Sequence, residues 1–273
     1  MERLKIYCVT NKILKNLEST DLILAGVGKD NFSSNYLTCN TKDNIFFKEK
    51  YYSELTFHYW FWKNMLDKNE DIWTGFCQKR RFWIKKEIKK KEINEINFNS
   101  SLLDTVPDEW KKYNSILFEP INVNNVKKMK IIKRGFKNFM RQPSILFNKN
   151  KRSLKLHFDM HHGYGNLDKA IEVMHEKDKE DFRKFVNSAY SYNPHIVFIA
   201  KPKIIDRWFE DLFKWLFQCE KIFGFQNLKG YDTQRLYAYL AERYLPFWFK
   251  KYTKNLEWPW VFYDGRILDN KKS

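Results

Sequence analysis

The stretch that decides the fold is residues 71–81, D-I-W-T-G-F-C-Q-K-R-R. Its first seven residues are mostly apolar and β-forming, which predicts a short strand. Its last four residues are polar or cationic and follow directly on that strand. Polar clusters at the carboxyl ends of strands are typical of an α/β sheet whose ligand crevice lies outside those ends.

The segments before this strand complete a strand, helix, strand order. Residues 4–9 alternate and predict a first strand that ends in Thr10-Asn11-Lys12, and residues 22–27 form a second apolar run. Residues 54–66, E-L-T-F-H-Y-W-F-W-K-N-M-L, predict a helix with Ser53 as its N-cap. Because this helix is apolar on more than one face, we expect it to lie centrally.

The rest of the chain predicts further helices and two more strands. We expect strands at 116–123, interrupted by Pro120, and at 196–200, and helices at 85–99, 167–175, 181–186, 204–223 and 233–249. No internal repeat or Gly/Ser linker divides the chain. The sequence therefore predicts one α/β domain, residues 1–273, with a helical C-terminal part.

A basic surface insertion is expected at about residues 85–155. Within it, residues 127–151 carry many cations among Ile and Phe side chains. This segment is either a basic amphipathic element that touches anionic lipid or a lipid-linked substrate, or an exposed insertion with one packed face. Gly135 and Pro143 interrupt the helical period, which favours the second interpretation.

The composition excludes several classes of protein. The 273 residues are 43% hydrophobic and 18% aromatic, too apolar for a disordered chain. The apolar runs are far shorter than the roughly 20 residues that span a bilayer, and the N-terminus lacks the pattern of a secretory signal, so we expect a cytoplasmic protein. Cys8, Cys39, Cys77 and Cys219 form no C-x-x-C pair, which argues against zinc ribbons and predicts reduced, mostly buried thiols.

The net charge of +17, from 50 Lys and Arg against 33 Asp and Glu, would suit a polyanionic partner such as nucleic acid or an acidic membrane leaflet. Most of these cations are Lys, whereas readers of bases and phosphates favour the bidentate fork of Arg. The excess of Lys, Asn, Ile and Phe is also the bias of an AT-rich genome. The charge therefore has a compositional explanation besides binding to phosphate or to a membrane surface.

Standard catalytic motifs are absent from the sequence. There is no G-x-G-x-x-G, P-loop, G-x-S-x-G or H-E-x-x-H motif, which removes local support for dinucleotide oxidoreductases, P-loop NTPases, common serine hydrolases and zincins. No Asp is followed two residues later by a second Asp. His161 and His162, with Asp159 and His157 nearby, could form a loop metal site, although a polar binding loop suits them better.

Four blocks resemble a known family. Y-S-E-L-T at 52–56 leads into Y-W-F-W-K-N at 59–64, G-F-C-Q-K-R-R-F stands at 75–82, D-N-I at 43–45, and G-Y-D at 230–232 precedes Arg235, Leu240, Glu242 and Arg243. Together they resemble a family encoded in bacterial capsule and exopolysaccharide loci and taken to be glycosyltransferases. The resemblance spans roughly residues 4–250 outside the expected insertion. Gln78, Lys79 and Asn11 stand where the family has His, Tyr and His, so acid/base roles of those histidines do not carry over.

The resemblance implies a GT-A-like α/β fold, a single open mixed sheet flanked by helices. It implies transfer of a sugar from a UDP- or GDP-linked nucleotide-sugar donor to a lipid-linked or polymeric glycan of the bacterial surface; hexosyl, galactofuranosyl and heptosyl transfer stay open. It places the protein at the inner face of the cytoplasmic membrane, beside anionic lipid and other capsule enzymes, with no nucleic-acid partner. The alternatives are a non-catalytic, membrane-peripheral capsule-assembly scaffold and, less favoured, a nucleic-acid-binding protein.

Departure of a nucleoside diphosphate requires a metal or cationic groups that stabilise the leaving charge. Because the Asp-x-Asp motif is missing, we assign no metal ligand, although the sequence is compatible with a divalent metal. We expect Arg80 and Arg81 to bind the diphosphate. The alternative is that one Arg pairs with Glu54 or Asp43. The donor-binding candidates are Thr10, Asn11, Lys12, Asp43, Asn44, Glu54, Gln78, Arg80 and Arg81.

Several of these candidates have a structural alternative. Thr10 could simply end a strand, Asp43 and Asn44 could form an Asx-turn, and Glu54 could be a capping acid. On the acceptor side an inverting enzyme needs a general base. The catalytic candidates are Asp232, for which an N-cap is the alternative, Asp159 and His162, and the acceptor-binding candidates are His161, Asn166 and Tyr231.

Two further features concern the acceptor. Residues 161–166, hinged by Gly163 and Gly165, would suit a lid over the acceptor or be an ordinary mobile loop. Trp248, Trp258 and Trp260 could stack on sugar rings, but such residues more often belong to the core.

Overall fold

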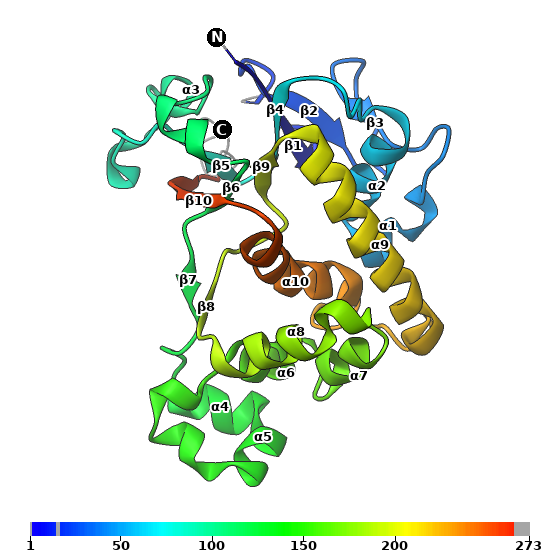
Figure 1. Cartoon of the computed structure of the whole chain (residues 1–273), viewed down its shortest axis with the longest axis vertical. Helices are drawn as coiled ribbons and strands as arrows, with labels where there is room; N and C mark the ends of the chain where they lie inside the picture. The colour runs from blue at the N-terminus through cyan, green and yellow to red at the C-terminus, as the bar shows by residue number, and fades with distance from the viewer. Residues whose placement is uncertain (1, 15–16, 265–273) are drawn as a thin grey trace, which may run out of the picture.

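The computed structural model describes residues 2–14 and 17–264. Its centre is an open mixed sheet in the order β10-β6-β9-β4-β1-β2-β3 (Figure 1). The strands are β1 (Arg3–Thr10), β2 (Ile23–Gly26), β3 (Leu37–Thr38), β4 (Ile72–Gln78), β6 (Ser115–Phe118), β9 (Phe198–Ala200) and β10 (Asn255–Trp258), with β5 (Arg81–Trp83) and β11 (Trp260–Phe262) attached through β4. β1 is parallel to β2 and β4, whereas β9 is antiparallel to β4 and β6. The predicted open mixed sheet is confirmed.

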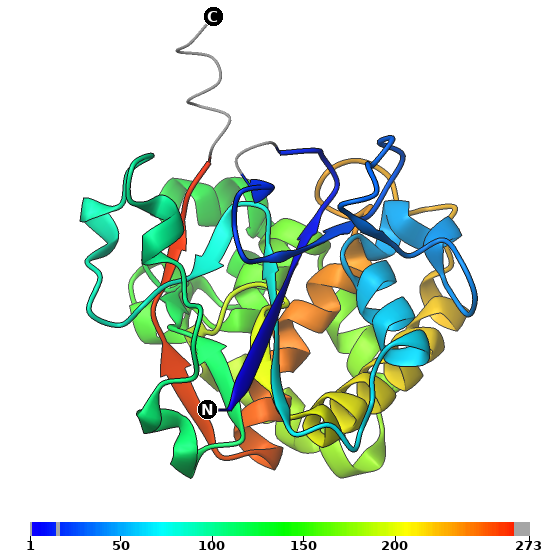
Figure 2. The ribbon, with the colours of Figure 1, turned by 90° about the horizontal axis from the view of Figure 1, so that it is seen from above.

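Strand β1 lies where the strand order reverses. From β1 the chain moves outward to β2 and β3, and then returns through α1 (Glu49–Tyr52) and α2 (Leu55–Asn64) to place β4 on the other side of β1. Figure 2 shows β1, in dark blue, crossing the middle of the molecule. Open α/β sheets bind ligands outside the carboxyl ends of the strands at such a reversal, which places the expected crevice after Thr10 and Gln78.

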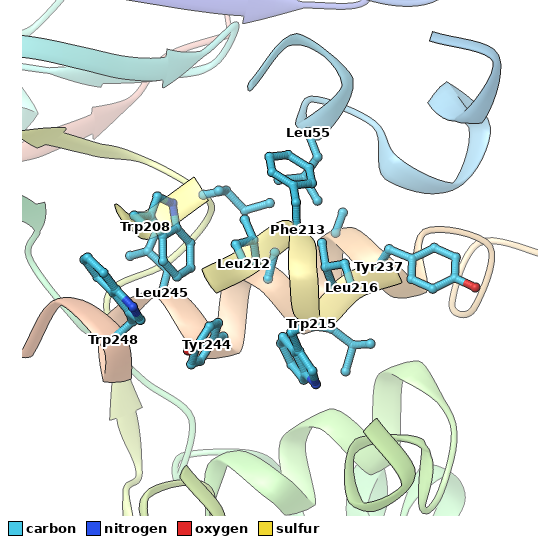
Figure 3. Packing of buried hydrophobic residues seen from close by; sticks show 14 of the residues in the cluster. Leu55, Trp208, Leu212, Phe213, Trp215, Leu216, Tyr237, Tyr244, Leu245 and Trp248 are labelled. Carbon is cyan, nitrogen blue, oxygen red and sulfur yellow. The ribbon is translucent and has the colours of Figure 1, made fainter. Parts of the chain in front are cut away.

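One face of the sheet is covered by α2, α9 (Pro202–Phe223) and α10 (Leu236–Tyr252). Side chains of α9 and α10, with Leu55 of α2, meet in a core rich in aromatic rings (Figure 3). His58 of α2 lies in this core against Phe76 and Phe209, and its burial lowers its pKa to about 3. The predicted central position of the helix at 54–66 is therefore confirmed.

The opposite face carries a second core built around tryptophan. Trp110 makes edge contacts with Trp73 and Trp258 at ring-centroid distances of 5.1 and 5.4 Å. Trp248 and Trp258 are buried, and Trp260 stacks on Phe118, so these three tryptophans serve the core. The short helix α3 (Phe98–Ser101) closes this face through Phe98.

A two-stranded ribbon, β7 (Ile121–Asn122) paired with β8 (Ser191–Tyr192), connects the sheet to a helical part, which lies at the bottom of Figure 1. Three helices, α6 (Leu154–His162), α7 (Asn166–Glu172) and α8 (Glu176–Ser188), pack against each other, and α6 and α8 also contact α10. Beyond them, α4 (Lys128–Arg134), α5 (Phe136–Arg141) and the 3-10 turns Pro143–Leu146 and Lys149–Lys151 form the far end of the molecule. We call residues 127–151 the basic module.

The structure corrects the expected helix at 85–99. A 3-10 turn, Lys90–Glu92, and then α3 are the helical elements of this stretch. The side chain of Asn94 accepts a hydrogen bond from the backbone N–H of Ile96, and the side chain of Asn97 accepts one from the N–H of Asn94. These local side-chain bonds compete with helical backbone pairing and hold the segment as turns.

Two further expectations are corrected and one is confirmed. The expected insertion at 85–155 contains β6, a buried strand paired with β9 and β10, so this stretch is not one continuous insertion outside the sheet. Ser53 does not cap α2: its backbone is left-handed with φ 52°, and the N-cap position is Glu54. All four cysteines are buried and free, as expected. Among the described residues, no helix is long and apolar enough to cross a membrane.

Candidate functional site

A two-lobed cleft lies at the carboxyl ends of β1 and β4. The first lobe, of about 230 Å³, extends toward Asn11, Ser53 and Lys79, and the second, of about 440 Å³, extends toward α6 and α10. Both lobes share one wall, made by Glu54, Gln78, Arg80, Arg81, Tyr231 and Arg235. The reversal of strand order thus positions a cleft where the sequence pattern predicted one.

Two adjacent arginines dominate the shared wall. Arg80 Nη1 forms an ion pair with Asp264 Oδ2 at 3.1 Å, and neither Arg pairs with Glu54 or Asp43 within the described part of the chain. The Nε atoms of Arg80 and Arg81 are buried without a hydrogen-bond partner among residues 2–14 and 17–264. Burial and the charge of Arg80 lower the pKa of Arg81. Guanidinium N–H groups that lack a protein partner at the carboxyl end of a strand suit an anionic ligand.

Hydrogen bonds tie the strand ends together beside these arginines. Gln78, at the end of β4, donates from Nε2 to Oε1 of Glu54 at the start of α2. Lys79 donates from Nζ to Oδ1 of Asn11, which follows β1. The polar residues expected at the two strand ends therefore meet in one place.

Three histidines of α6 line the second lobe. His161 and His162 form its last helical turn, not a loop, and His157 lies one turn earlier. Arg134 and Arg243 can only donate, so the Nδ1 atoms of His161 and His157 accept from them at 3.1 Å each. The Nδ1 of His162 faces the carbonyl oxygen of Asp232 at 3.1 Å and therefore donates, which leaves its Nε2 as an acceptor.

All three rings are neutral at pH 7. Burial, together with the charge of Arg243, lowers the pKa of His157 to about 2 and that of His162 to about 4. Burial and the charges of Lys130 and Arg134 lower the pKa of His161 to about 4. His162 also stacks on Tyr239 with ring centroids 3.6 Å apart. The cluster thus offers neutral imidazoles to the cleft and not cations.

Helix α10 supplies a buried ion pair to the back of the second lobe. Arg243 Nη1 donates to Glu242 Oε2 at 2.8 Å, and the Arg243 guanidinium lies 4.2 Å from the ring centroid of Tyr192. Burial opposes ionisation of Glu242, but Arg243 and His195 outweigh it and hold the pKa of Glu242 well below its ordinary value. Glu242 is therefore a carboxylate in the wall of the cleft.

Nine of the predicted site residues line the cleft. They are Asn11, Glu54, Gln78, Arg80, Arg81, His161, His162, Tyr231 and, beside His162, Asp232, whose side chain is 47% exposed. Asp232 lies in the turn before α10, which has Arg235 at its N-cap position, so Asp232 does not cap that helix. Asp232 Oδ2 lies 3.4 Å from Arg134 Nη1.

The other predicted donor residues lie outside the cleft lining. Thr10 donates to the carbonyl of Lys12 at 2.6 Å and ends β1, and Lys12 pairs with Asp30. Asn44 accepts from the N–H of Phe46 and forms an Asx-turn, and Asp43 accepts from the Tyr59 hydroxyl. The contacts of Thr10 and Asn44 are those of the strand-end and Asx-turn alternatives, whereas Asp43 bonds to Tyr59 instead of forming an Asx-turn.

Asp159 and Asn166 also have structural partners. The side chain of Asp159 is fully buried, and its oxygens accept from Asn138, Lys155 and the N–H of Gly165. Asn166 donates from Nδ2 to the carbonyl of His162 at 2.9 Å. Both side chains fix the turn between α6 and α7, in which Gly163 and Gly165 have positive φ.

Several cleft residues carried no role in the sequence argument. Tyr239, Glu242 and Arg243 follow Arg235 at helical spacing, so an i, i+4, i+7, i+8 pattern of polar residues could have revealed this face of α10. Tyr192 and His195 had no such signal, because Tyr192 ends the two-residue strand β8 and His195 lies in the irregular connection from β8 to β9. No group of three His, Cys, Asp or Glu side chains among residues 2–14 and 17–264 could hold a metal ion.

The chain resembles a solved structure, the apo form of WbbM, which is described as a bifunctional glycosyltransferase. The TM-score is 0.64 with 20% sequence identity, over 96% of this chain and 46% of that chain. This chain therefore spans about half the length of that protein, and the likeness shows a shared fold, consistent with the predicted GT-A-like architecture. No curated protein matches the sequence. The family model described as "Domain of unknown function (DUF4422)" matches residues 5–254, and the chain belongs to this family.

Proposed function

We propose that this protein is a glycosyltransferase that moves a sugar from a nucleoside-diphosphate donor to a hydroxyl acceptor. The observation that carries the proposal is the wall of Arg80, Arg81 and Arg235 between two lobes at the reversal point of an open α/β sheet. Two lobes on either side of a cationic wall suit a donor whose nucleoside and sugar are joined by a diphosphate. The fold shared with a protein described as a glycosyltransferase supports the same class of reaction.

The donor is proposed to lie across the shared wall. The nucleoside occupies the first lobe beside Asn11 and Lys79, and the diphosphate contacts Arg80 and Arg81. The sugar then extends into the second lobe. Each charge-assisted hydrogen bond from a guanidinium contributes about 1.5–3 kcal/mol, and such bonds strengthen as charge develops on the leaving diphosphate.

The acceptor is proposed to enter the second lobe. Its hydroxyl oxygen attacks the anomeric carbon, the bond from that carbon to the diphosphate oxygen breaks, and the diphosphate leaves with the electron pair. Asp232 takes the hydroxyl proton as general base, while the neutral His162 orients the acceptor by accepting a hydrogen bond at Nε2. Tyr231, which is 85% exposed at the rim, contacts the acceptor. Because this assignment uses a base, it predicts an inverting enzyme.

The acceptor class rests on the sequence resemblance. The blocks at 52–64, 75–82 and 230–243 resemble transferases encoded with capsule and exopolysaccharide genes. We therefore propose a growing bacterial surface glycan, lipid-linked or polymeric, as the acceptor and a UDP- or GDP-sugar as the donor.

A binding experiment on three proteins tests the donor site. Wild type, Arg81→Ala and the matched control Arg207→Ala, whose side chain is exposed on α9, are melted with UDP, GDP, CMP and dTDP sugars, each with and without Mn²⁺. We expect one nucleotide class at about 100 times its Kd to raise the Tm of the wild type and control by about 5 °C, and Arg81→Ala to lose this shift. No shift with any donor, or an equal shift in Arg81→Ala, would overturn the assignment. A rise in Tm that requires Mn²⁺ would indicate that a metal, and not the arginines, binds the diphosphate.

A further inference from the structure

The basic module carries an unusual run of charge. No acidic residue occurs between Glu119 and Asp159, whereas this stretch contains eleven cations, namely Lys127, Lys128, Lys130, Lys133, Arg134, Lys137, Arg141, Lys149, Lys151, Arg152 and Lys155. The nine that belong to the module itself are all exposed. Apart from Arg134, which pairs with Asp232, none of the nine has an ion-pair partner in the described part of the chain. Much of the positive charge of the protein is therefore gathered, unneutralised, at one end.

The same surface exposes large apolar side chains. Met129, Phe136, Met140 and Phe147 are 61%, 55%, 63% and 80% exposed, and Ile132 beside them is 36% exposed. Met129 and Ile132 lie three residues apart on α4, and Phe136 and Met140 four residues apart on α5, so each pair shares one side of its helix. Lys128 Nζ lies 5.2 Å from the ring centroid of Phe147, so the apolar and cationic groups are interleaved.

These exposed apolar side chains are separate from the core of the basic module. The module has its own small core, in which Ile131 and Ile145 pack against Leu156 and Met160 of α6. Gly135 allows the close approach of α4 to α6, because a Cβ there would lie 2.9 Å from the carbonyl oxygen of Ile131 and 3.0 Å from Met160 Cγ. The inner face is thus packed, and the exposed apolar groups form a separate outer face.

We propose that the outer face of the basic module binds the surface of a membrane that contains anionic phospholipid. Exposed lysines attract the negative headgroups, and the interleaved Met and Phe side chains enter the boundary between headgroups and acyl chains. Neither signal holds a protein at a membrane alone, but the two together do. Residues 127–151 hold no acidic residue, so their surface is complementary in charge to an anionic bilayer.

The module also connects the membrane to the cleft. Lys130 lines the second lobe, and Arg134 contacts both His161 and Asp232 there. A module seated on a bilayer would therefore bring the second lobe close to the lipid headgroups. Membrane binding does not rest on the proposed transfer reaction, because vesicle binding is measured without donor or acceptor.

The first test measures binding to phosphatidylcholine vesicles with and without phosphatidylglycerol, by sedimentation in low salt. We expect the wild type to bind the anionic vesicles and not the neutral ones. The triple variant Lys128→Glu, Lys133→Glu, Lys137→Glu should lose roughly tenfold or more of this binding. The matched control Lys203→Glu, Lys214→Glu, Lys221→Glu makes the same change of charge at exposed positions of α9 and should keep it. An equal loss in both variants, or no preference for anionic vesicles, would overturn the proposal.

The second test separates insertion from simple charge attraction. Met140→Ser with Phe147→Ser should abolish the part of vesicle binding that survives about 0.5 M NaCl, because screening leaves only the apolar contribution. The control Phe47→Ser with Ile96→Ser removes side chains that are 77% and 96% exposed elsewhere and should have no effect. Wild-type binding that vanishes in high salt, or that is replaced by binding of duplex DNA or RNA through the same lysines, would refute a membrane-inserting surface.

Discussion

Glu242 Oε1 accepts a hydrogen bond from the backbone N–H of His195 at 2.7 Å and lies 3.2 Å from Nδ1 of the same residue. His195 has a positive φ of 65°, a conformation that costs a residue with a Cβ about 1 kcal/mol or more. The carboxylate on α10 therefore holds a strained turn at the edge of the cleft, in the connection that leads to β9. Since Glu242 also pairs with the buried Arg243, one side chain links the turn to the back wall of the second lobe.

Replacement of Glu242 by Gln should lower the free energy of unfolding by about 3 kcal/mol, because it leaves the buried Arg243 without its carboxylate. The pKa of Glu242 is lower in the folded protein than its ordinary 4.5. The carboxylate therefore stabilises the fold fully above pH 4.5, and this contribution is lost as the pH falls through the folded value.

Urea unfolding of wild type and Glu242→Gln at several pH values checks this prediction. The difference between the two proteins should be constant near pH 7 and shrink below pH 4.5. Glu210→Gln, at an exposed position on α9, serves as the control and should match the wild type at every pH. A difference that grows toward acid pH would contradict the role assigned to the Glu242 charge.

Asp232→Asn should lower kcat by about 100-fold or more while nucleotide binding stays unchanged, because loss of the base affects the acceptor hydroxyl and not the diphosphate. Asp43→Asn is the informative comparison. Asp43 was predicted to bind the donor but contacts Tyr59 outside the cleft lining, so this variant should keep kcat and KM near the wild-type values. Equal losses in both variants would point to a general effect on folding.

Arg152 is expected to hold the basic module together. Its buried guanidinium donates to four backbone carbonyls, those of Asn124, Val126, Ile145 and Leu146, at 2.8–3.1 Å. Arg152→Lys cannot keep all four bonds and should cost about 2 kcal/mol locally, which corresponds to roughly 30-fold faster amide exchange in residues 127–151. Hydrogen-exchange mass spectrometry measures this, with the exposed Arg141→Lys as control. Unchanged exchange in Arg152→Lys would show that the small core suffices.

The sequence predicted those parts of the fold that depend on local pattern. Residues 4–9 and 71–77 became β1 and β4 because buried strands need continuous or alternating apolar side chains, and 204–223 became α9 because its apolar residues recur at helical spacing. The short strands β5 and β11 were not predicted, because they pair Trp83 with Trp260, which are distant in the sequence, and such pairing leaves no local signal. The helix predicted at 85–99 was wrong, because Asn side chains form hydrogen bonds with backbone N–H groups of this segment.

The candidate site divides in the same way. Asn11, Gln78, Arg80 and Arg81 could be placed in advance, because each ends β1 or β4 or follows it within three residues at the reversal point. His195 could not, since its position depends on a positive φ and on Glu242, 47 residues away. Polar type alone did not distinguish Asp232, which lines the cleft, from Asp159, whose oxygens are engaged by Asn138 of α5, Lys155 and the backbone N–H of Gly165.

The neutral state of His162 makes a prediction about pH. The pKa of His162 falls from 6.5 to about 4 on folding. Between these pH values His162 is therefore protonated in the unfolded chain and neutral in the folded protein. The free energy of unfolding should therefore decrease as the pH falls from 6.5 to about 4, with His162 alone contributing on the order of 2 kcal/mol between pH 7 and pH 5. His162→Gln removes this titration and should flatten the pH dependence by that amount in urea unfolding, even though loss of the stack on Tyr239 lowers its stability at pH 7. Because His161 and His157 still titrate in this variant, some slope must remain. A slope equal to that of the wild type would mean that His162 is charged in the folded protein. Its Nε2 could then not accept the hydrogen bond that is proposed to orient the acceptor.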